Sequence, residues 1–204
     1  MSLSSNSQEM HSRIVRFKDL RKQGIPLMFI DSILSGHQRM NYGVLGDTAS
    51  ENPDFSPYIS VPHKFQIGMF CALPGSGPAY HTHDYTEMFL ILSGRWRFYW
   101  GTDPAGEPED EAILEKWDMI TLPPKLWRGF EVDSDKPAWG FAVLDPHSGF
   151  AGKDPYWAPQ VIQQAAERGF SADATGKMIK PDNYDELRDA TYDRLWEAIQ
   201  EADE

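Results

Sequence analysis

The chain has 204 residues, of which 41% are hydrophobic and 25% charged, which is typical of one folded domain with its own core. Its 19 basic and 31 acidic residues give a formal net charge of −12, and this excludes nucleic acid as an expected partner because such binding draws on basic side chains. The apolar runs are too short to span a bilayer, and the single cysteine cannot form an internal disulfide, so we expect no membrane contact and a cytoplasmic location.

The first sixty residues carry several different signals. Residues 1–12 are polar and rich in serine, which predicts a disordered leader. Apolar side chains at helical spacing predict a short helix over 13–23, and the dense apolar run over 25–30 predicts a strand. The stretch 36–57 is crowded with Gly, Asn, Asp and Pro, which predicts a long ordered loop. Residues 13–60 are therefore assigned to a segment that packs on the body of the protein.

From residue 61 onward, short apolar segments alternate with turn residues. Seven strands are expected, over 64–73, 79–92, 95–100, 112–114, 118–122, 127–132 and 138–144. Short strands at this spacing are typical of a sandwich or barrel, so the sequence predicts a mainly β domain over 61–150. In the third strand the register stays open: either Phe98 and Trp100 face inward, or Arg97 and Tyr99 do.

The last part of the chain, residues 151–204, has the pattern of a helical extension. One helix is predicted over 156–168, with Pro155 or Pro159 near its start and Gly169 at its end. A second helix is predicted over 182–200, where apolar residues recur at helical spacing. We expect these helices to pack on the β domain or on a partner subunit.

Residues 75–94 combine two imidazoles and a carboxylate in an apolar setting. Because alternate residues of a strand share a face, His81, His83 and Glu87 are expected to point the same way. This donor set leaves open coordination positions and suits divalent iron, with manganese, nickel, cobalt or zinc as alternatives. Two histidines in a strand are also common as ordinary polar residues, so the residues alone leave a site with no metal equally open.

The spacing of this segment resembles the first motif of the cupin superfamily, whose defining positions are all filled, by Gly75, His81, His83, Glu87 and Gly94. The resemblance covers about residues 60–146. It implies an antiparallel jelly-roll β-barrel with the motif residues lining its interior. Since cupins frequently pair, it also implies a homodimer.

The second cupin motif is degenerate in this chain. Asp118 and Pro123 match it, Trp117 and Lys125 replace its two glycines, and Arg128 stands where the resemblance places a fourth metal ligand, a histidine. A guanidinium cannot ligate a metal. It can swing away, pair with Glu87 and leave a metal-free pocket, or hold an anionic substrate against a metal. His63 and His147 are further candidates for a fourth ligand, although an ordinary loop histidine is the more common role.

The resemblance implies a cupin-type protein that binds a divalent metal, iron foremost, and acts on a small, anionic organic molecule. Dioxygenase-like chemistry is the first expectation, with isomerase or lyase chemistry beside it. The alternative is a non-catalytic cupin that binds a small molecule and whose metal site has decayed. The side chains expected to bind the substrate are Arg128, Trp127, Phe89 and Tyr85, and further expected walls are Phe130, Trp139 and Phe141.

Overall fold

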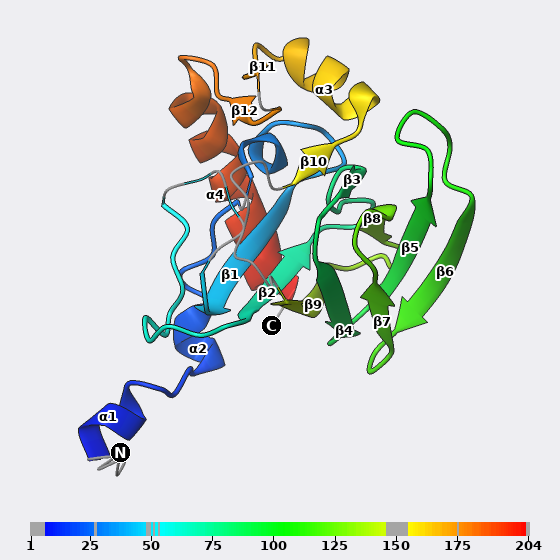
Figure 1. Cartoon of the computed structure of the whole chain (residues 1–204). Coiled ribbons are helices and arrows are strands. Elements are labelled where there is room, and N and C mark those ends of the chain that lie inside the picture. The colour runs from blue at the N-terminus through cyan, green and yellow to red at the C-terminus, as the bar shows by residue number, and fades with distance from the viewer. Residues whose placement is uncertain are drawn as a thin grey trace.

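The computed structural model describes residues 7–26, 28–47, 50, 52, 54–145, 155–174 and 176–202. Two five-stranded sheets form its body (Figure 1). The first sheet has the order β1 (Arg39–Leu45), β2 (Gln66–Ala72), β9 (Ala138–Asp145), β4 (Thr86–Ile91) and β7 (Met119–Leu122). The second has the order β10 (Tyr156–Trp157), β3 (His81–Thr82), β8 (Trp127–Val132), β5 (Arg95–Gly101) and β6 (Asp110–Glu115).

The strand pairs within both sheets are antiparallel. Consecutive strands change sheets repeatedly, as in a jelly roll. Strands distant in the sequence therefore become neighbours, as β2 does with β9 and β5 with β8. This arrangement confirms the predicted mainly β barrel. All seven predicted strands are present, and the longest of them, over 79–92, is divided into β3 and β4 by a bend at residues 84–85.

Aromatic side chains fill the space between the sheets. Phe130 stacks on Phe98 with ring centroids 4.7 Å apart and meets Phe89 edge-on at 4.8 Å. Phe98 is 1% exposed, whereas Arg97 lies outside and pairs with carboxylates of neighbouring strands. The open register of β5 is thereby settled, with Phe98 facing inward.

Three predictions for the N-terminal part differ from the structure. A helix, α1 (Ser7–His11), lies within the expected leader, and the helix expected over 13–23 is reduced to α2 (Phe17–Leu20). The apolar run over 25–30 forms one β-bridge at Ile25 and the start of a 3-10 helix, η1 (Phe29–Ser32), instead of a strand. Its side chains are apolar because they are buried, and burial alone does not distinguish a strand from a helical turn.

The predicted loop over 36–57 is wrong in its first part, because it contains β1. This strand pairs with β2 over most of its length. Its residues alternate, with Met40 and Tyr42 packed in the cluster that includes Trp139 of β9 and Leu195, while Arg39 and Asn41 line the cavity described below. The strand therefore presents its polar side chains to the interior and its apolar ones to the outside.

The C-terminal part covers the outside of the first sheet and one end of the barrel (Figure 1). The predicted helices are found as α3 (Pro159–Ala166), with Pro159 in its first turn, and α4 (Tyr184–Ala202). Residues 156–157 belong to β10 instead of the helix, and a short hairpin, β11 (Ser171–Ala172) and β12 (Met178–Ile179), lies between the helices. Leu195 and Ile199 of α4 are fully buried against the outer face of β1 and β9.

The helices in the described residues include none with the length and apolarity that a membrane crossing requires.

Candidate metal centre

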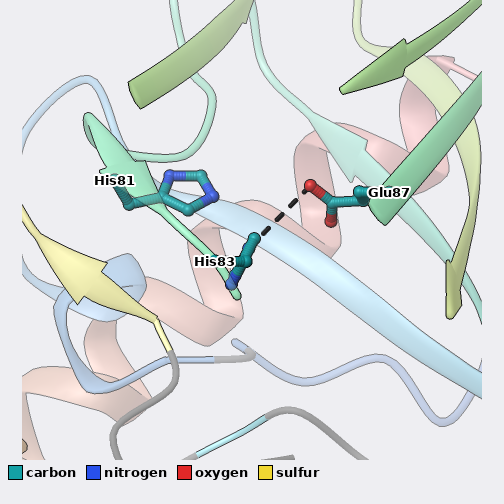
Figure 2. Close-up of side chains that lie close together, drawn as sticks. All are labelled: His81, His83 and Glu87. Carbon is teal, nitrogen blue, oxygen red and sulfur yellow. Dashed lines mark ion pairs between the residues drawn. The ribbon is translucent and has the colours of Figure 1, made fainter. Parts of the chain in front are cut away.

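Three side chains converge at one end of the barrel, from β3, from the residue that follows it and from β4. The possible ligand atoms of His81, His83 and Glu87 all lie within 4.8 Å of one another, and each residue is buried. Figure 2 shows the two imidazoles and the carboxylate turned toward a common space. The structure thus brings together the three residues that the sequence suggests as metal ligands.

Tight turns around the motif fix where these strands begin and end. Gly94, which closes the first motif, has φ +69°, and an added Cβ would lie 2.5 Å from the Cβ of Ala138, so glycine is required there. Trp117 and Lys125, which replace the glycines of the second motif, also have left-handed φ values of 78° and 66°. The backbone therefore keeps both turns without glycine. The turn at Lys125 also supports the site, because its N–H donates to the carbonyl oxygen of His83 at 2.7 Å.

His81 is held as a neutral imidazole with one nitrogen available. Its Nδ1 lies 2.6 Å from the carbonyl oxygen of Ala79, and since a carbonyl only accepts, Nδ1 carries the proton and Nε2 keeps its lone pair. Burial, with a smaller contribution from the guanidinium of Arg128, holds the pKa of His81 well below its ordinary value of 6.5. Neutral imidazole is the form that binds a metal.

His83 is oriented by Tyr85. The His83 Nδ1 and the Tyr85 hydroxyl are 3.0 Å apart, and the two rings stack with centroids 4.7 Å apart. On the other side of the ring, Nε2 lies 3.8 Å from Oε2 of Glu87. If a metal binds Nε2, the proton of the neutral ring is on Nδ1. This N–H then donates a hydrogen bond to the Tyr85 hydroxyl oxygen.

Arg128 holds the carboxylate of Glu87 from behind. It is fully buried, and its Nη2 donates to Glu87 Oε2 at 3.1 Å, while Nη1 donates to the Leu126 carbonyl at 2.9 Å. Of the three arrangements that the sequence left open, this is the pairing with Glu87. Both contacts that Glu87 makes to His83 and Arg128 use Oε2, so Arg128 holds the carboxylate oxygen that faces His83.

A cavity opens in front of the three side chains. Its apolar wall includes Phe70, Phe130 and Leu144, and the expected substrate-binding residues Tyr85 and Phe89 also line it. The cavity has a volume of about 60 Å³, which corresponds to room for roughly four to six water molecules. Such a space suits a small ligand.

Two of the expected substrate-binding residues lie elsewhere. Arg128 is not among the described residues that line the cavity, because its guanidinium is enclosed between the strands and bound to Glu87. Trp127 packs on the opposite side of β8, with its ring 6.1 Å from that of Tyr80. The parity of β8 explains the difference, since Trp127 and Phe130 face opposite sides of the sheet. Of the further expected walls, Phe130 lines the cavity, and Trp139 packs with the outer cluster.

Neither further histidine joins the site within the described residues. His63 lies outside the cluster, with its ring near Phe65 and Nδ1 2.5 Å from the Val61 carbonyl oxygen. His147 lies outside the described residues. The donor set is therefore two imidazoles and one carboxylate, a combination that fits a divalent first-row metal with open positions for other ligands.

Three polar residues of the cavity were not expected from the sequence: Arg39, Asn41 and Gln66. Arg39 and Asn41 belong to β1, where a loop was expected. The signal that could have located them is the alternation of polar and apolar residues over 39–44, which is typical of a strand.

Comparison with known proteins gives matches among solved structures alone: no protein-family model matches the chain, and neither does a curated protein. A cupin-2 domain protein, Rru_A2000 from Rhodospirillum rubrum, is 16% identical, with 68% of this chain and 76% of that chain covered and a TM-score of 0.45. A putative sugar phosphate isomerase from Acidithiobacillus ferrooxidans is 13% identical, with 67% of this chain and 77% of that chain covered and a TM-score of 0.49.

A third match is a chain from crystal structures of the DMSP lyases RdDddP and RnDddQII, at 16% identity and a TM-score of 0.42. It covers 59% of this chain and 52% of that chain, so this chain spans about half the length of that one. At these identities the matches concern the fold and not the activity. The jelly-roll topology, with a complete first motif on β3 and β4, gives this chain the cupin fold.

Proposed function

We propose that this protein binds one divalent metal inside its barrel and acts on a small, anionic organic molecule held next to it. The observation that supports this most directly is the convergence of His81, His83 and Glu87 within 4.8 Å at the wall of an apolar cavity. Iron is the metal we expect first, with manganese, nickel, cobalt and zinc as alternatives.

Each ligand has a neighbour that fixes its orientation. The Ala79 carbonyl holds His81, the Tyr85 hydroxyl holds His83 and the Arg128 guanidinium holds Glu87. Such contacts favour one ring orientation and one proton position, which lowers the cost of arranging the ligands around a metal. When bound, a metal of this kind supplies Lewis-acid chemistry or activation of oxygen.

The charges around the cavity favour an anionic ligand. Glu87 is paired with Arg128 at 3.1 Å, and Asp31 is paired with Arg39 at 3.4 Å. Each of these carboxylates already balances the charge of one guanidinium. A divalent ion bound here would therefore add positive charge that the two carboxylates do not neutralise. In a largely apolar cavity an unbalanced charge is costly, so an anionic ligand completes the site.

Metal titration of purified protein tests this proposal. We expect chelator-stripped protein to bind one equivalent of iron(II) under anaerobic conditions, and His81→Ala to bind none. His63→Ala serves as a matched control, because His63 lies outside the cluster, and it should bind one equivalent. Equal uptake by His81→Ala and the unmodified chain would contradict the proposal.

The Arg128–Glu87 contact favours a second candidate function, a non-catalytic cupin that binds a small molecule without a metal. In that case the guanidinium takes the place of the metal as the partner of Glu87. Replacing Arg128 by His distinguishes the two. Tight metal binding that arises only in Arg128→His would support the second candidate, whereas metal binding by the unmodified chain supports the first.

A further inference from the structure

Arg39 of β1 is the buried guanidinium that lines the cavity. The residue is 8% exposed, and its Nε donates to Oδ2 of Asp31 at 3.4 Å. Asp31 is fully buried in η1 and also accepts from the backbone N–H of Met28. The contact between Arg39 and Asp31 uses only the Nε donor of the guanidinium. Within the described part of the chain, its two Nη groups have no hydrogen-bond partner.

Arg39 and the candidate metal ligands face the same space. Both Arg39 and His81 line the cavity. The Arg39 guanidinium carbon also lies 6.0 Å from the centre of the Phe130 ring in the cavity wall. Arg39 is thus part of the cavity lining, beside the aromatic wall.

Asn41 provides a second donor on the same strand face. It is two residues from Arg39, so both side chains project from one side of β1. Asn41 is 5% exposed, it lines the cavity, and its Nδ2 has no hydrogen-bond partner among the described residues. A buried amide N–H₂ without a partner is costly, which suggests that a ligand satisfies it.

We propose that Arg39 and Asn41 form a carboxylate-binding subsite, and that the ligand is a small organic acid with a second polar group directed at His81, His83 and Glu87. The second half of this statement rests on the proposed function, whereas the subsite itself does not. A planar carboxylate matches the two parallel donors of a guanidinium edge and leaves an oxygen lone pair for an amide N–H.

The cavity limits the size of the acid. A volume of about 60 Å³ accommodates a molecule of roughly four to six non-hydrogen atoms, since one water needs about 10–15 Å³ by the same measure. Acids with two or three carbons and a hydroxyl or keto group away from the carboxylate have this size. Phe70, Phe130 and Leu144 would contact the carbon atoms of such a ligand.

Calorimetric titration with 3-hydroxypropionate and its uncharged amide, 3-hydroxypropionamide, tests the subsite. Both probes have the same shape, so any preference measures recognition of charge. We expect the metal-loaded chain to bind the acid at least tenfold more tightly than the amide. The same titrations on chelator-stripped protein, with propionate and propionamide, test the subsite without the metal.

The Asn41→Asp variant keeps the size of the side chain and adds a negative charge next to Arg39, so it should weaken acid binding at least tenfold and change amide binding by less than threefold. Arg39→Lys keeps the positive charge but lacks the paired guanidinium donors, so its affinity for the acid should also fall at least threefold. Arg97→Lys, at a half-buried position on the outer face of the barrel, is the matched control and should bind as the unmodified chain does.

The outcomes separate the two proposals. Metal uptake with no preference for the acids, or with a preference that Asn41→Asp and Arg39→Lys both retain, overturns the subsite and leaves the proposed function standing. Preference for propionate in stripped protein, lost in both variants, supports the subsite even where no metal binds, in which case the proposed function fails. Circular dichroism of each variant confirms that it is folded before titration.

Discussion

At the scale of single residues, Arg128 determines how the site behaves without a metal. Its guanidinium is fully buried and pairs with Glu87, so Arg128→Met leaves a buried carboxylate without its partner. In chelator, we expect the free energy of unfolding to fall by about 3–5 kcal/mol. A bound metal should reduce this loss, because it offsets the Glu87 charge. Urea denaturation with and without metal measures both effects.

Arg97→Met is the control for that change, because Arg97 forms ion pairs on the outer face of the barrel. Exposed pairs contribute about 0–1 kcal/mol, so this variant should lose little stability. Equal losses in the two variants would show that the Arg128–Glu87 pair has no special role.

A second residue-scale prediction concerns pH. Burial lowers the pKa of His37 below its ordinary value of 6.5, and its Nδ1 lies 3.2 Å from the Gly77 carbonyl oxygen. Because the unfolded chain then binds protons more readily than the folded one, the stability from His37 is present above pH 6.5 and is lost as the pH falls below it. We expect the urea midpoint to drop between pH 7.5 and 5.5, and His37→Gln to reduce that drop.

His81 contributes to the same pH dependence in metal-free protein, because its pKa is also lowered. His37→Gln should therefore diminish the drop without abolishing it. His11→Gln, an exposed position on α1, is the control. A drop of unchanged size in His37→Gln would contradict the prediction.

At the scale of elements, the turns of the second motif show what the loss of glycine costs. Trp117 has φ 78° and a 63% exposed side chain. A non-glycine residue in the left-handed region is destabilised by about 1–2 kcal/mol, so Trp117→Gly should raise the free energy of unfolding by about 1 kcal/mol. Trp117→Ala keeps the backbone penalty and should give no such gain. Thermal or urea denaturation of both variants shows whether the gain comes from relief of the backbone penalty or from removal of the indole side chain.

The strands illustrate how far the sequence predicts the structure. The seven barrel strands and the grouping of His81, His83 and Glu87 follow from short apolar segments and strand parity. β1 was mistaken for a loop because Gly, Asn and Pro around it outweighed the alternation of its residues. Its inward positions are the polar Arg39 and Asn41, the reverse of the usual pattern, because they face a cavity instead of an apolar core.

The direction of the Arg128 side chain could not be predicted from strand parity alone. Parity places it inward, but whether it reaches the cavity or Glu87 depends on packing between β3, β8 and β4. Packing between distant segments also explains the apolar run over 25–30. Its residues Met28, Phe29 and Ile30 are buried in one cluster with the C-terminal segment, without forming a strand.

At the scale of the whole molecule, α4 is a structural support of the barrel. Leu195 is fully buried against the outer face of the first sheet, so Leu195→Ala should lower the free energy of unfolding by about 2–5 kcal/mol. Glu197→Ala, at an exposed position of the same helix, should change it by less than about 0.5 kcal/mol. Loss of metal binding in folded Leu195→Ala would contradict a purely structural role for α4.

The homodimer expected from the resemblance is an independent proposal at this scale. Since the buried face of α4 is used within the chain, we expect any dimer to form through other surfaces. Light scattering of Leu195→Ala under folding conditions should then give the same mass as the unmodified chain. A change from dimer to monomer would instead place α4 in the contact between subunits.

The most direct test of the metal centre is anomalous X-ray diffraction from crystals of iron-loaded protein, with data collected on both sides of the iron absorption edge. We predict one anomalous peak per chain, within bonding distance of His81, His83 and Glu87. A loaded crystal with no peak there would contradict the metal centre.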